Sequence, residues 1–294
     1  MNPGGAARVD IPDCLEWLRA TPAGAAWLAA LPERAQEIAR EWELALGEPY
    51  ADSLVSLVLP VTNADGDAVL KLQFPHRESD HEAAALACWD GNGAVRLIAH
   101  DPPRHALLLE RCTPGTHLAE AGPNRALDVL IGLVPRLWRP AGAPFTPLAD
   151  EAARWAEHLG ADWQRAGRPF ERTLVDAALD LLGSLPASQG EHVLLHQDLH
   201  GDNVLAAERE PWLVIDPKPL AGEREFALAP IIRSCELGHS RAAVRYRLDR
   251  LSADLGLDRE RARGWAVAQT VAWSIGSRFV EQHVETARWL IDEA

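Results

Sequence analysis

Short apolar runs alternate with polar residues in the middle of the chain, and this pattern constrains the fold more than any other. The runs are Val193–Leu195, Val204–Leu205 and Leu213–Ile215. Runs of this length bounded by turn residues predict short buried strands around a turn. Asp198, Asn203 and Asp216 stand at the ends of these predicted strands. A strand pair between Asn203 and Asp216 would fold the second side chain back beside the first.

These polar residues have the chemistry of a cation site. Oxygen-bearing side chains suit a hard cation that coordinates phosphates. We therefore predict Asn203 and Asp216 as metal ligands and Asp198 as the base that orients or deprotonates a hydroxyl. Each residue alone could instead cap a turn. His196 and His200 are spaced for zinc on a helix, but no glutamate follows His196 and the flanks predict strands. We expect His196 to brace the loop through hydrogen bonds.

Composition bounds the class of protein. A chain of 294 residues can form one large domain or two lobes. Its net charge of −14 argues against a general nucleic-acid binder and suits a cationic partner or simply an acidic surface. The four cysteines are scattered, which favours a reducing compartment. With neither a secretory signal nor an apolar run of about 18 residues, we expect a cytoplasmic protein that binds no membrane.

The first third of the chain predicts a small antiparallel sheet with helices. Cys14–Leu46 has helical periodicity, with expected breaks at Pro22 and Pro32. A hairpin turn over residues 63–67 separates the first two expected strands. The expected strands are Leu54–Pro60, Ala68–Phe74, Val95–Ala99 and Ala106–Glu110, and His81–Trp89 is an expected helix.

The rest of the chain is mostly helical in pattern. The segments with apolar residues three and four apart are Arg125–Trp138, Leu148–Arg165, Arg172–Leu185, Glu225–Leu237, Arg241–Leu255 and Arg259–Glu293. The sequence therefore predicts an α+β protein, with a small β-rich lobe followed by a larger helical lobe that contains the central strands.

The central motif resembles that of a known enzyme family. His196–Asn203 followed by Ile215–Pro217 is similar to the Brenner-type motif of aminoglycoside phosphotransferases, within the protein-kinase-like superfamily. More narrowly, the chain resembles the streptomycin 6-phosphotransferase branch, the aminoglycoside/hydroxyurea resistance kinases. The strings that carry this likeness are Trp212–Pro217, Gly222-Glu223, Gly93–Leu97 and Leu107–Arg111. Gln197 departs from the pattern, because the family usually has glycine there.

The resemblance implies a bilobal protein-kinase-like fold that uses ATP and Mg²⁺. Residues 1–112 would form the nucleotide-binding lobe with its leading helices, and residues 113–294 the catalytic and substrate-binding lobe. Lys71 would bind phosphate oxygens and pair with Glu82. Alternatively, Lys71 is an exposed edge-strand residue and Glu82 only suits the helix dipole. The chain has no glycine-rich loop, so Ser53 would contact a phosphate, and Glu110 and Cys112 would meet adenine through their main chain.

The resemblance also implies a small cationic acceptor. Streptomycin carries guanidinium groups, which acidic side chains would bind by charge-assisted hydrogen bonds. The candidates are Asp202, Glu223, Glu225, Glu236 and Glu281. Asp202 could instead cap a turn, and each of the other four could be an ordinary exposed carboxylate. Trp265 and Trp273 could line the same pocket, but a helical core stripe explains their spacing better.

The sequence thus predicts an ATP-dependent O-phosphotransferase, a monomer or weak dimer, that phosphorylates streptomycin at the 6 position and confers antibiotic resistance. A first alternative is a kinase of the same fold for hydroxyurea, another aminoglycoside, an amino sugar or a metabolic alcohol. A second is a non-catalytic nucleotide-binding regulator, against which the complete set of catalytic and nucleotide-binding candidates argues.

Overall fold

The chain folds into two compact units, each with its own layers of secondary structure. The computed structural model describes residues 9–51 and 53–292. The first unit contains the chain up to Gly91 together with Val95–Thr113. The second contains Asn92–Ala94 and the chain from Pro114 onward. The mixture of an antiparallel sheet and many helices confirms the predicted α+β class.

The first unit is built on an antiparallel sheet of five strands in the order β1-β2-β3-β5-β4. The predicted hairpin is present, since Asn63 pairs with Gly66 at the end of β2 and β3. The strands are β1 (Ala45–Leu46), β2 (Ser56–Asn63), β3 (Gly66–Gln73), β4 (Leu97–Asp101) and β5 (Ala106–Glu110). The helical segments are η1 (Asp13–Ala20), α1 (Pro22–Glu41), α2 (Glu82–Trp89) and η2 (Pro102–Arg104).

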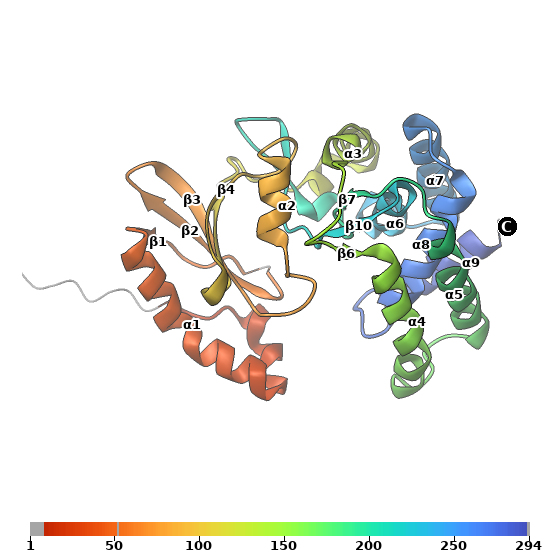
Figure 1. Ribbon diagram of the computed structural model, residues 1–294, viewed down its shortest axis with the longest axis horizontal. Helices are drawn as coiled ribbons and strands as arrows, with labels where there is room; N and C mark the ends of the chain where they lie inside the picture. The colour runs from red at the N-terminus through yellow and green to blue at the C-terminus, as the bar shows by residue number, and fades with distance from the viewer. Residues whose placement is uncertain (1–8, 52, 293–294) are drawn as a thin grey trace, which may run out of the picture. The chain divides into compact units, whose positions relative to one another are not determined.

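Helix α1 covers one face of this sheet. Its apolar stripe, which includes Leu28, Leu31 and Ile38, packs against alternate buried residues of β2 and β3 such as Leu59 and Leu70. Figure 1 shows α1 and α2 flanking the strands. The predicted break at Pro32 is wrong, because α1 continues through it. Burial of the stripe on both sides of the proline offsets the hydrogen bond that proline cannot donate.

The second unit is mostly helical, with two small sheets. Strand β10 lies between β6, to which it is parallel, and β7, to which it is antiparallel, while β8 and β9 form a hairpin. The strands are β6 (Thr146–Pro147), β7 (Val193–Leu195), β8 (Val204–Ala206), β9 (Trp212–Val214) and β10 (Leu220–Gly222). The α-helices are α3 (Pro123–Leu137), α4 (Leu148–Arg165), α5 (Arg172–Ser184), α6 (Ala229–Arg233), α7 (Arg241–Leu255), α8 (Arg259–Ser274) and α9 (Val280–Ile291). The 3-10 segments are η3 (Leu118–Ala121), η4 (Leu185–Ser188), η5 (Gly201–Asn203), η6 (Arg224–Leu228) and η7 (Cys235–Leu237).

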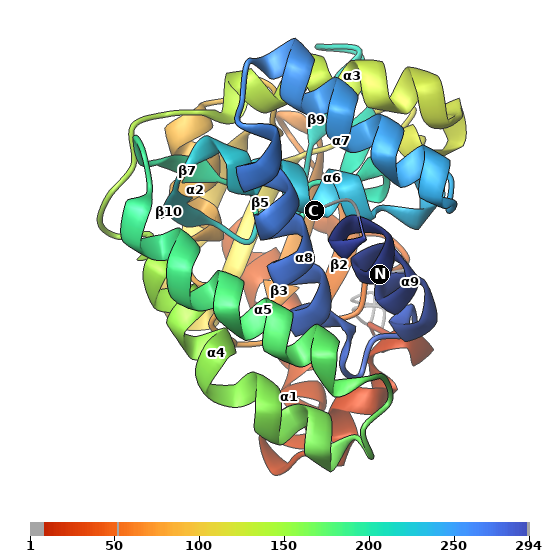
Figure 2. The same ribbon diagram turned by 90° about the vertical axis from the view of Figure 1, so that its right-hand side faces the viewer.

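Helix α8 is the centre of this unit. It packs against α5, α6, α7 and α9 and is buried along most of its length (Figure 2). The single helix predicted over Arg259–Glu293 is wrong, because residues 275–279 separate α8 from α9 and Gly276 there has a φ of 78°. The helix predicted over Glu225–Leu237 is likewise broken into η6, α6 and η7, with Ser234 leaving the helical conformation.

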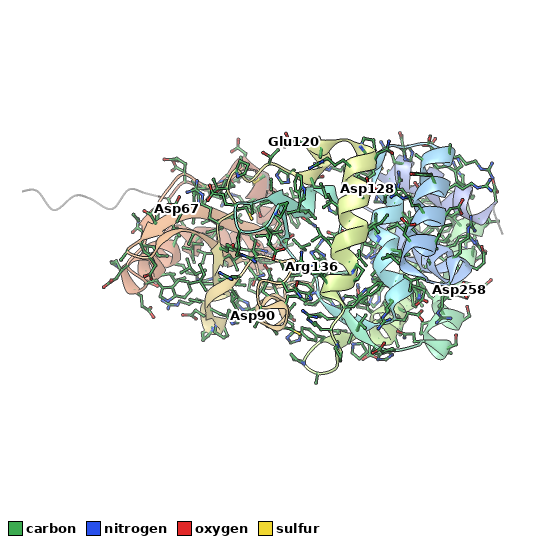
Figure 3. The ribbon with its side chains drawn as sticks, turned by 90° about the horizontal axis from the view of Figure 1, so that it is seen from above. Asp67, Asp90, Glu120, Asp128, Arg136 and Asp258 are labelled. Carbon is green, nitrogen blue, oxygen red and sulfur yellow. The ribbon has the colours of Figure 1, made fainter. Side chains whose placement is uncertain are left out.

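A short segment from the first third of the chain belongs to this second unit. Arg136 lies on α3, where Figure 3 labels it. It donates to Asn92 Oδ1 from Nε at 2.9 Å and from Nη2 at 2.7 Å. The same side chain pairs with Glu210 at 2.7 Å. The Gly93 carbonyl accepts a hydrogen bond from Val214 N–H at 2.9 Å, which joins the segment to β9. These contacts explain why residues 92–94 leave the first unit.

Two further expectations concern the described part of the chain as a whole. None of its helices has the length and apolar character needed to cross a bilayer. All four cysteines lie within it, and none forms a disulfide, as their scattered positions predict.

Candidate active site

The strands of the central motif form as the sequence predicts, and they bring its polar residues together. Strand β7 ends at Leu195, directly before the loop that carries Asp198. Strands β8 and β9 pair with Val204 opposite Val214, and the N–H of Ile215 donates to the Asn203 carbonyl at 3.0 Å. Asn203 and Asp216 therefore lie at the same end of one hairpin. Asp216 has a φ of 53°, a left-handed conformation that aspartate tolerates better than most residues.

His196 braces this loop, as expected. Its Nδ1 accepts from the Asp198 N–H at 3.3 Å, and its Nε2 lies 2.9 Å from the carbonyl oxygen of Ile215. One neutral tautomer, protonated at Nε2, satisfies both contacts. Burial lowers the pKa of His196 to about 4, which maintains that neutral form. The ring ties the start of the loop to the segment that carries Asp216, and both nitrogens are used without zinc.

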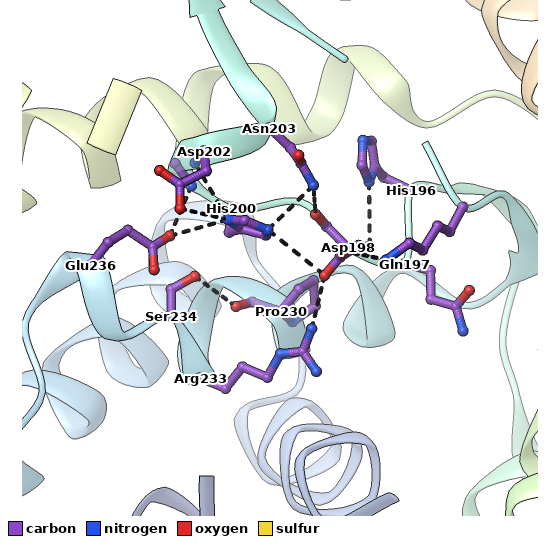
Figure 4. A network of polar contacts seen from close by, with 12 residues as sticks. His196, Gln197, Asp198, His200, Asp202, Asn203, Pro230, Arg233, Ser234 and Glu236 are labelled. Carbon is purple, nitrogen blue, oxygen red and sulfur yellow. Dashed lines mark hydrogen bonds and ion pairs between the residues drawn. The ribbon is translucent and has the colours of Figure 1, made fainter. Parts of the chain in front are cut away.

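The Asp198 carboxylate lies between two cations. Oδ2 accepts from Lys218 Nζ at 2.6 Å. Oδ1 accepts from Arg233 Nη2 at 2.9 Å, a contact that Figure 4 shows. His200 Nε2 lies 3.9 Å from Oδ1. Burial opposes ionisation, but Lys218, His200 and Arg233 hold the pKa of Asp198 well below its usual range. Asp198 is therefore ionised and fixed at both oxygens.

Two further carboxylates, those of Glu236 and Asp202, lie beside His200. Glu236 Oε1 accepts from the Gly201 N–H at 2.9 Å and lies 3.5 Å from His200 Nδ1 (Figure 4). Although burial opposes its charge, the contacts with His200 and Gly201 lower the pKa of Glu236 to about 2. Asp202 is exposed, and its Oδ2 lies 3.9 Å from His200 Nδ1. Of the five predicted acceptor-binding residues, the structure thus brings Asp202 and Glu236 together beside the Asp198 loop.

The predicted metal ligands fit a hard cation. Within the described residues, the Asn203 amide makes its hydrogen bonds through Nδ2, to the Asp198 carbonyl at 2.8 Å and to His200 Nε2 at 3.3 Å. This leaves the Asn203 Oδ1 for a cation, with the Asp216 carboxylate at the same end of the hairpin. An amide oxygen and a carboxylate are the ligands that Mg²⁺ takes beside substrate phosphates.

In the first unit, Lys71 and Glu82 form the ion pair that the sequence predicts. Lys71 Nζ donates to Glu82 Oε1 at 2.9 Å and to Oε2 at 2.7 Å, and both side chains are buried. Lys71 lies on the face of β3 opposite the one covered by α1, because side chains alternate along a strand. Gln73 Nε2 also donates to Glu82. The alternative of an exposed edge-strand lysine is wrong.

The other predicted nucleotide-binding residues lie near the ends of the sheet strands. Ser53 precedes β2, and its carbonyl accepts from the Cys14 thiol at 3.0 Å. Glu110 ends β5, where its carboxylate accepts from the Arg96 N–H at 3.0 Å and its own N–H donates to the Arg96 carbonyl. Cys112 follows and is half-buried. The Glu110 N–H is therefore already used within the sheet and would not be the group that Glu110 offers to adenine.

The remaining acidic candidates lie apart from Asp198. Glu223 is 1% exposed, pairs with Arg261 and accepts from the indole N–H of Trp265. It is a partner inside the core, so we leave it out of the proposed acceptor contacts. Glu225 is half-buried in η6 and Glu281 is exposed on α9, and neither is linked to Asp198 by a hydrogen bond or ion pair within the described residues. Trp265 is fully buried, which supports the core interpretation.

Sequence reasoning missed Lys218 and Arg233. Neither residue lies in the motif that carries the resemblance, and Arg233 reaches Asp198 from 35 residues away. One signal was available for the lysine, because Lys71 and Lys218 are the only lysines among the 29 lysines and arginines of the chain. No comparable signal marks Arg233 in a chain so rich in arginine.

Comparison with known proteins extends over most of the chain. A sequence model of the family described as aminoglycoside/hydroxyurea antibiotic resistance kinase matches residues 41–279. The chain is 41% identical over 263 residues to a streptomycin 6-kinase from Streptomyces glaucescens, covering 86% of this chain and 85% of the relative. It is 40% identical over 285 residues to a hydroxyurea phosphotransferase from Kitasatospora aureofaciens, covering 92% and 82%.

Similarity to solved structures concerns the fold. The crystal structure of the choline kinase LicA from Streptococcus pneumoniae matches 87% of this chain and 95% of its own, with a TM-score of 0.63 at 14% identity. A match of this kind confirms the predicted kinase-like fold.

Proposed function

The chain belongs to the family of aminoglycoside/hydroxyurea antibiotic resistance kinases, and on that premise we propose that it transfers the γ-phosphoryl group of ATP to the 6-hydroxyl of streptomycin. The observation that carries this proposal is the ionised Asp198, fixed at both oxygens beside the hairpin end that holds Asn203 and Asp216. This arrangement serves the transfer of a phosphoryl group to a hydroxyl. The biological outcome would be resistance to the antibiotic.

The reaction follows from the placement of these residues. The hydroxyl oxygen attacks the γ-phosphorus, the bond to the bridging oxygen breaks, ADP leaves, and the hydroxyl proton passes to Asp198. Asn203 and Asp216 would hold Mg²⁺, which neutralises phosphate charge when bound. We propose that residues 1–112 hold the nucleotide, with Lys71, oriented by Glu82, on the phosphates. Ser53 would contact a phosphate, and the chain at Glu110 and Cys112 would contact adenine.

The acceptor would bind through carboxylates of the helical unit. Asp202 is exposed next to the Asp198 loop, and Glu236 lies beside it. Their charges suit a guanidinium or ammonium group of a small cationic molecule. Because ATP is supplied inside the cell, we place the reaction in the cytoplasm.

A panel of acceptors tests the substrate. Purified protein is incubated with Mg²⁺ and ATP and with streptomycin, hydroxyurea or another aminoglycoside, and ADP release is followed by a coupled assay. We expect turnover on streptomycin, with one phosphoryl group added at the 6 position, as established by mass spectrometry and phosphorus NMR. ADP release that ignores the acceptor, or turnover on every compound except streptomycin, would overturn the choice of substrate.

Hydroxyurea is the second candidate, because a relative of 40% identity that covers 92% of this chain is a hydroxyurea phosphotransferase. Hydroxyurea is neutral and has no need of an acidic site. Neutralising Asp202 therefore separates the two candidates: Asp202→Asn should raise KM for streptomycin and leave KM for hydroxyurea unchanged.

Replacement of the proposed base tests the chemistry. We expect Asp198→Ala to reduce phosphotransfer by about a thousandfold or more, since it removes the group that orients and accepts the hydroxyl proton. Nucleotide binding, measured by isothermal titration calorimetry, should stay close to that of the unmodified protein. Turnover at an ordinary rate in this variant would remove Asp198 from the mechanism.

A further inference from the structure

The chain uses lysine in two places only, and each lysine faces a carboxylate in the interior. Lys71 pairs with Glu82, and Lys218 with Asp198, while the other cationic side chains of the sequence are arginines. Arginine presents a planar fork of five donors, whereas lysine places one compact charge on a flexible stem. A single charge can pair with one carboxylate oxygen and leave room at that oxygen for a second donor, such as a substrate hydroxyl.

The contacts at Asp198 have this form. Lys218 Nζ donates to Oδ2 of the carboxylate at 2.6 Å, and Arg233 Nη2 donates to Oδ1 at 2.9 Å. The side chain of Arg233 is 8% exposed and that of Lys218 is 21% exposed. Arg233 is thus buried, whereas Lys218 is partly exposed to solvent. A carboxylate offers about four lone-pair positions, so both oxygens retain capacity for the acceptor hydroxyl.

Both cations also lie over one aromatic ring. The guanidinium carbon of Arg233 is 4.5 Å, and Lys218 Nζ is 5.1 Å, from the ring centroid of Trp273 on α8. Such contacts attract a cation to the ring face. The indole therefore fixes the two charges side by side, where they would repel each other without the Asp198 carboxylate between them.

We propose that Lys218 and Arg233, which both lie over the Trp273 ring, are positioning residues that hold the Asp198 carboxylate in one orientation, aimed at the acceptor hydroxyl. This inference rests on the proposed phosphotransfer and adds to it the groups that set the geometry of the base. A carboxylate flanked by two cations is a weak base, so it orients the hydroxyl and receives its proton only as the bond to phosphorus forms. The buried Arg233 fixes Oδ1, and the more exposed Lys218 fixes Oδ2.

Steady-state kinetics of Lys218→Met provide the first test. We expect kcat to fall by about ten- to a hundredfold, because a misplaced base loses much of its effect. KM for ATP should not change, since Lys218 acts through Asp198. The matched control is Arg154→Met, which also removes a cation from a buried carboxylate, Glu151, but on α4. It should leave kcat and KM for ATP unchanged. A fall in kcat of the same size in both variants, or none in Lys218→Met, would overturn the proposal.

The second test needs no turnover. Thermal unfolding midpoints are compared for Lys218→Met, Asp198→Ala and the double variant. Removing Lys218 should lower the midpoint by more in the presence of Asp198 than in Asp198→Ala, where the ion pair between the two residues is already lost. Equal shifts in both backgrounds would show that Lys218 and Asp198 are not coupled and would refute the positioning role of Lys218. If Lys218→Met does not fold, Lys218→Gln takes its place.

The two tests distinguish a wrong assignment of the positioning residues from a wrong proposed function. A wild-type protein that turns over no acceptor rejects the phosphotransfer, and the unfolding cycle then decides the pairing by itself. A wild type that phosphorylates an acceptor while Lys218→Met retains full kcat keeps the function and rejects the positioning role.

Discussion

Gln197 has a left-handed backbone conformation directly before Asp198, with a φ of 64°. Glycine, which the resemblance predicts at this position, adopts such a conformation without steric cost. In this chain Gln269 of α8 donates from Nε2 to the Gln197 carbonyl at 2.9 Å, which holds the backbone in place. We therefore expect the loop to depend on the backbone conformation of residue 197 and not on the glutamine side chain.

Two substitutions of Gln197 should separate these effects. We expect Gln197→Gly to fold and to keep phosphotransfer, because it preserves the backbone conformation and the accepting carbonyl. Gln197→Val should lose roughly 1 to 3 kcal/mol more free energy of unfolding, since a β-branched residue tolerates a positive φ poorly. Urea unfolding of both variants checks this. Equal stability would show that the conformation imposes no constraint at this position.

What the sequence could predict at single positions depended on how far away the partner lies. Lys71 and Glu82 are 11 residues apart and sit on adjacent elements, so their ion pair could be anticipated. Arg233 and Asp198 are joined only by the folding of α6 onto the loop. Glu223 looked like an exposed carboxylate, and its burial depends on Arg261 and Trp265, which lie 38 and 42 residues further along. The spacing of apolar residues does not predict polar contacts between residues so far apart in the sequence.

Among the larger elements, helix α7 fixes the segment that carries Arg233 and Glu236. Arg247 of α7 is 1% exposed, and within the described residues its hydrogen bonds all go to main-chain carbonyls of this segment. Its contacts are with Ile232 at 2.8 and 3.1 Å, Leu237 at 3.0 Å and Gly238 at 2.7 Å. Burial lowers the pKa of Arg247 to about 10, so it remains charged at neutral pH. The carbonyls replace water around the buried guanidinium.

Removal of this side chain should weaken both stability and the site. Arg247→Met keeps an apolar stem and leaves the carbonyls of Ile232, Leu237 and Gly238 without their donor. We expect a loss of roughly 3 kcal/mol or more in the free energy of unfolding. We also expect a lower kcat, because Arg233 and Glu236 lose their support. Arg245→Met, an exposed neighbour on the same helix, should change neither quantity. A similar loss in both variants would mean that the effect belongs to α7 as a helix.

The helices themselves show where local sequence is sufficient. The predicted bounds of α4 and α7 agree with the structure, because each has a continuous apolar stripe and clear end signals. The long helix predicted after Arg259 ignored Gly276, a residue that favours a helix end. Pro32 was given too much weight, since packing of α1 on the sheet overrides a single unfavourable residue. Local signals fail where tertiary packing opposes them.

For the protein as a whole, buried histidines should make stability depend on pH. Burial, together with the nearby charge of Arg233, lowers the pKa of His283 to about 4, and burial lowers that of His196 to the same value. The reference value in an unfolded chain is 6.5. Between pH 6.5 and pH 4 these histidines are therefore protonated in the unfolded state but neutral in the folded state. This contribution to stability is complete above pH 6.5 and is lost as the pH falls toward 4. The lowered carboxyl pKa values of Asp198 and Glu236 contribute stability that is complete above their ordinary values of 3.8 and 4.5 and is lost as the pH falls below these values.

His283→Gln should flatten this part of the stability profile. His283 lies on α9, and within the described residues its Nδ1 has no hydrogen-bond partner, so the substitution breaks no hydrogen bond at that nitrogen. A pKa shift of one unit corresponds to about 1.4 kcal/mol, so each of the two histidines accounts for up to about 3 kcal/mol between pH 6.5 and 4. The loss measured by urea unfolding across this range should fall by about half in His283→Gln. The exposed His158→Gln variant should follow the unmodified protein. A profile of undiminished slope in His283→Gln would mean that His283 accepts a proton in the folded state as readily as in the unfolded one.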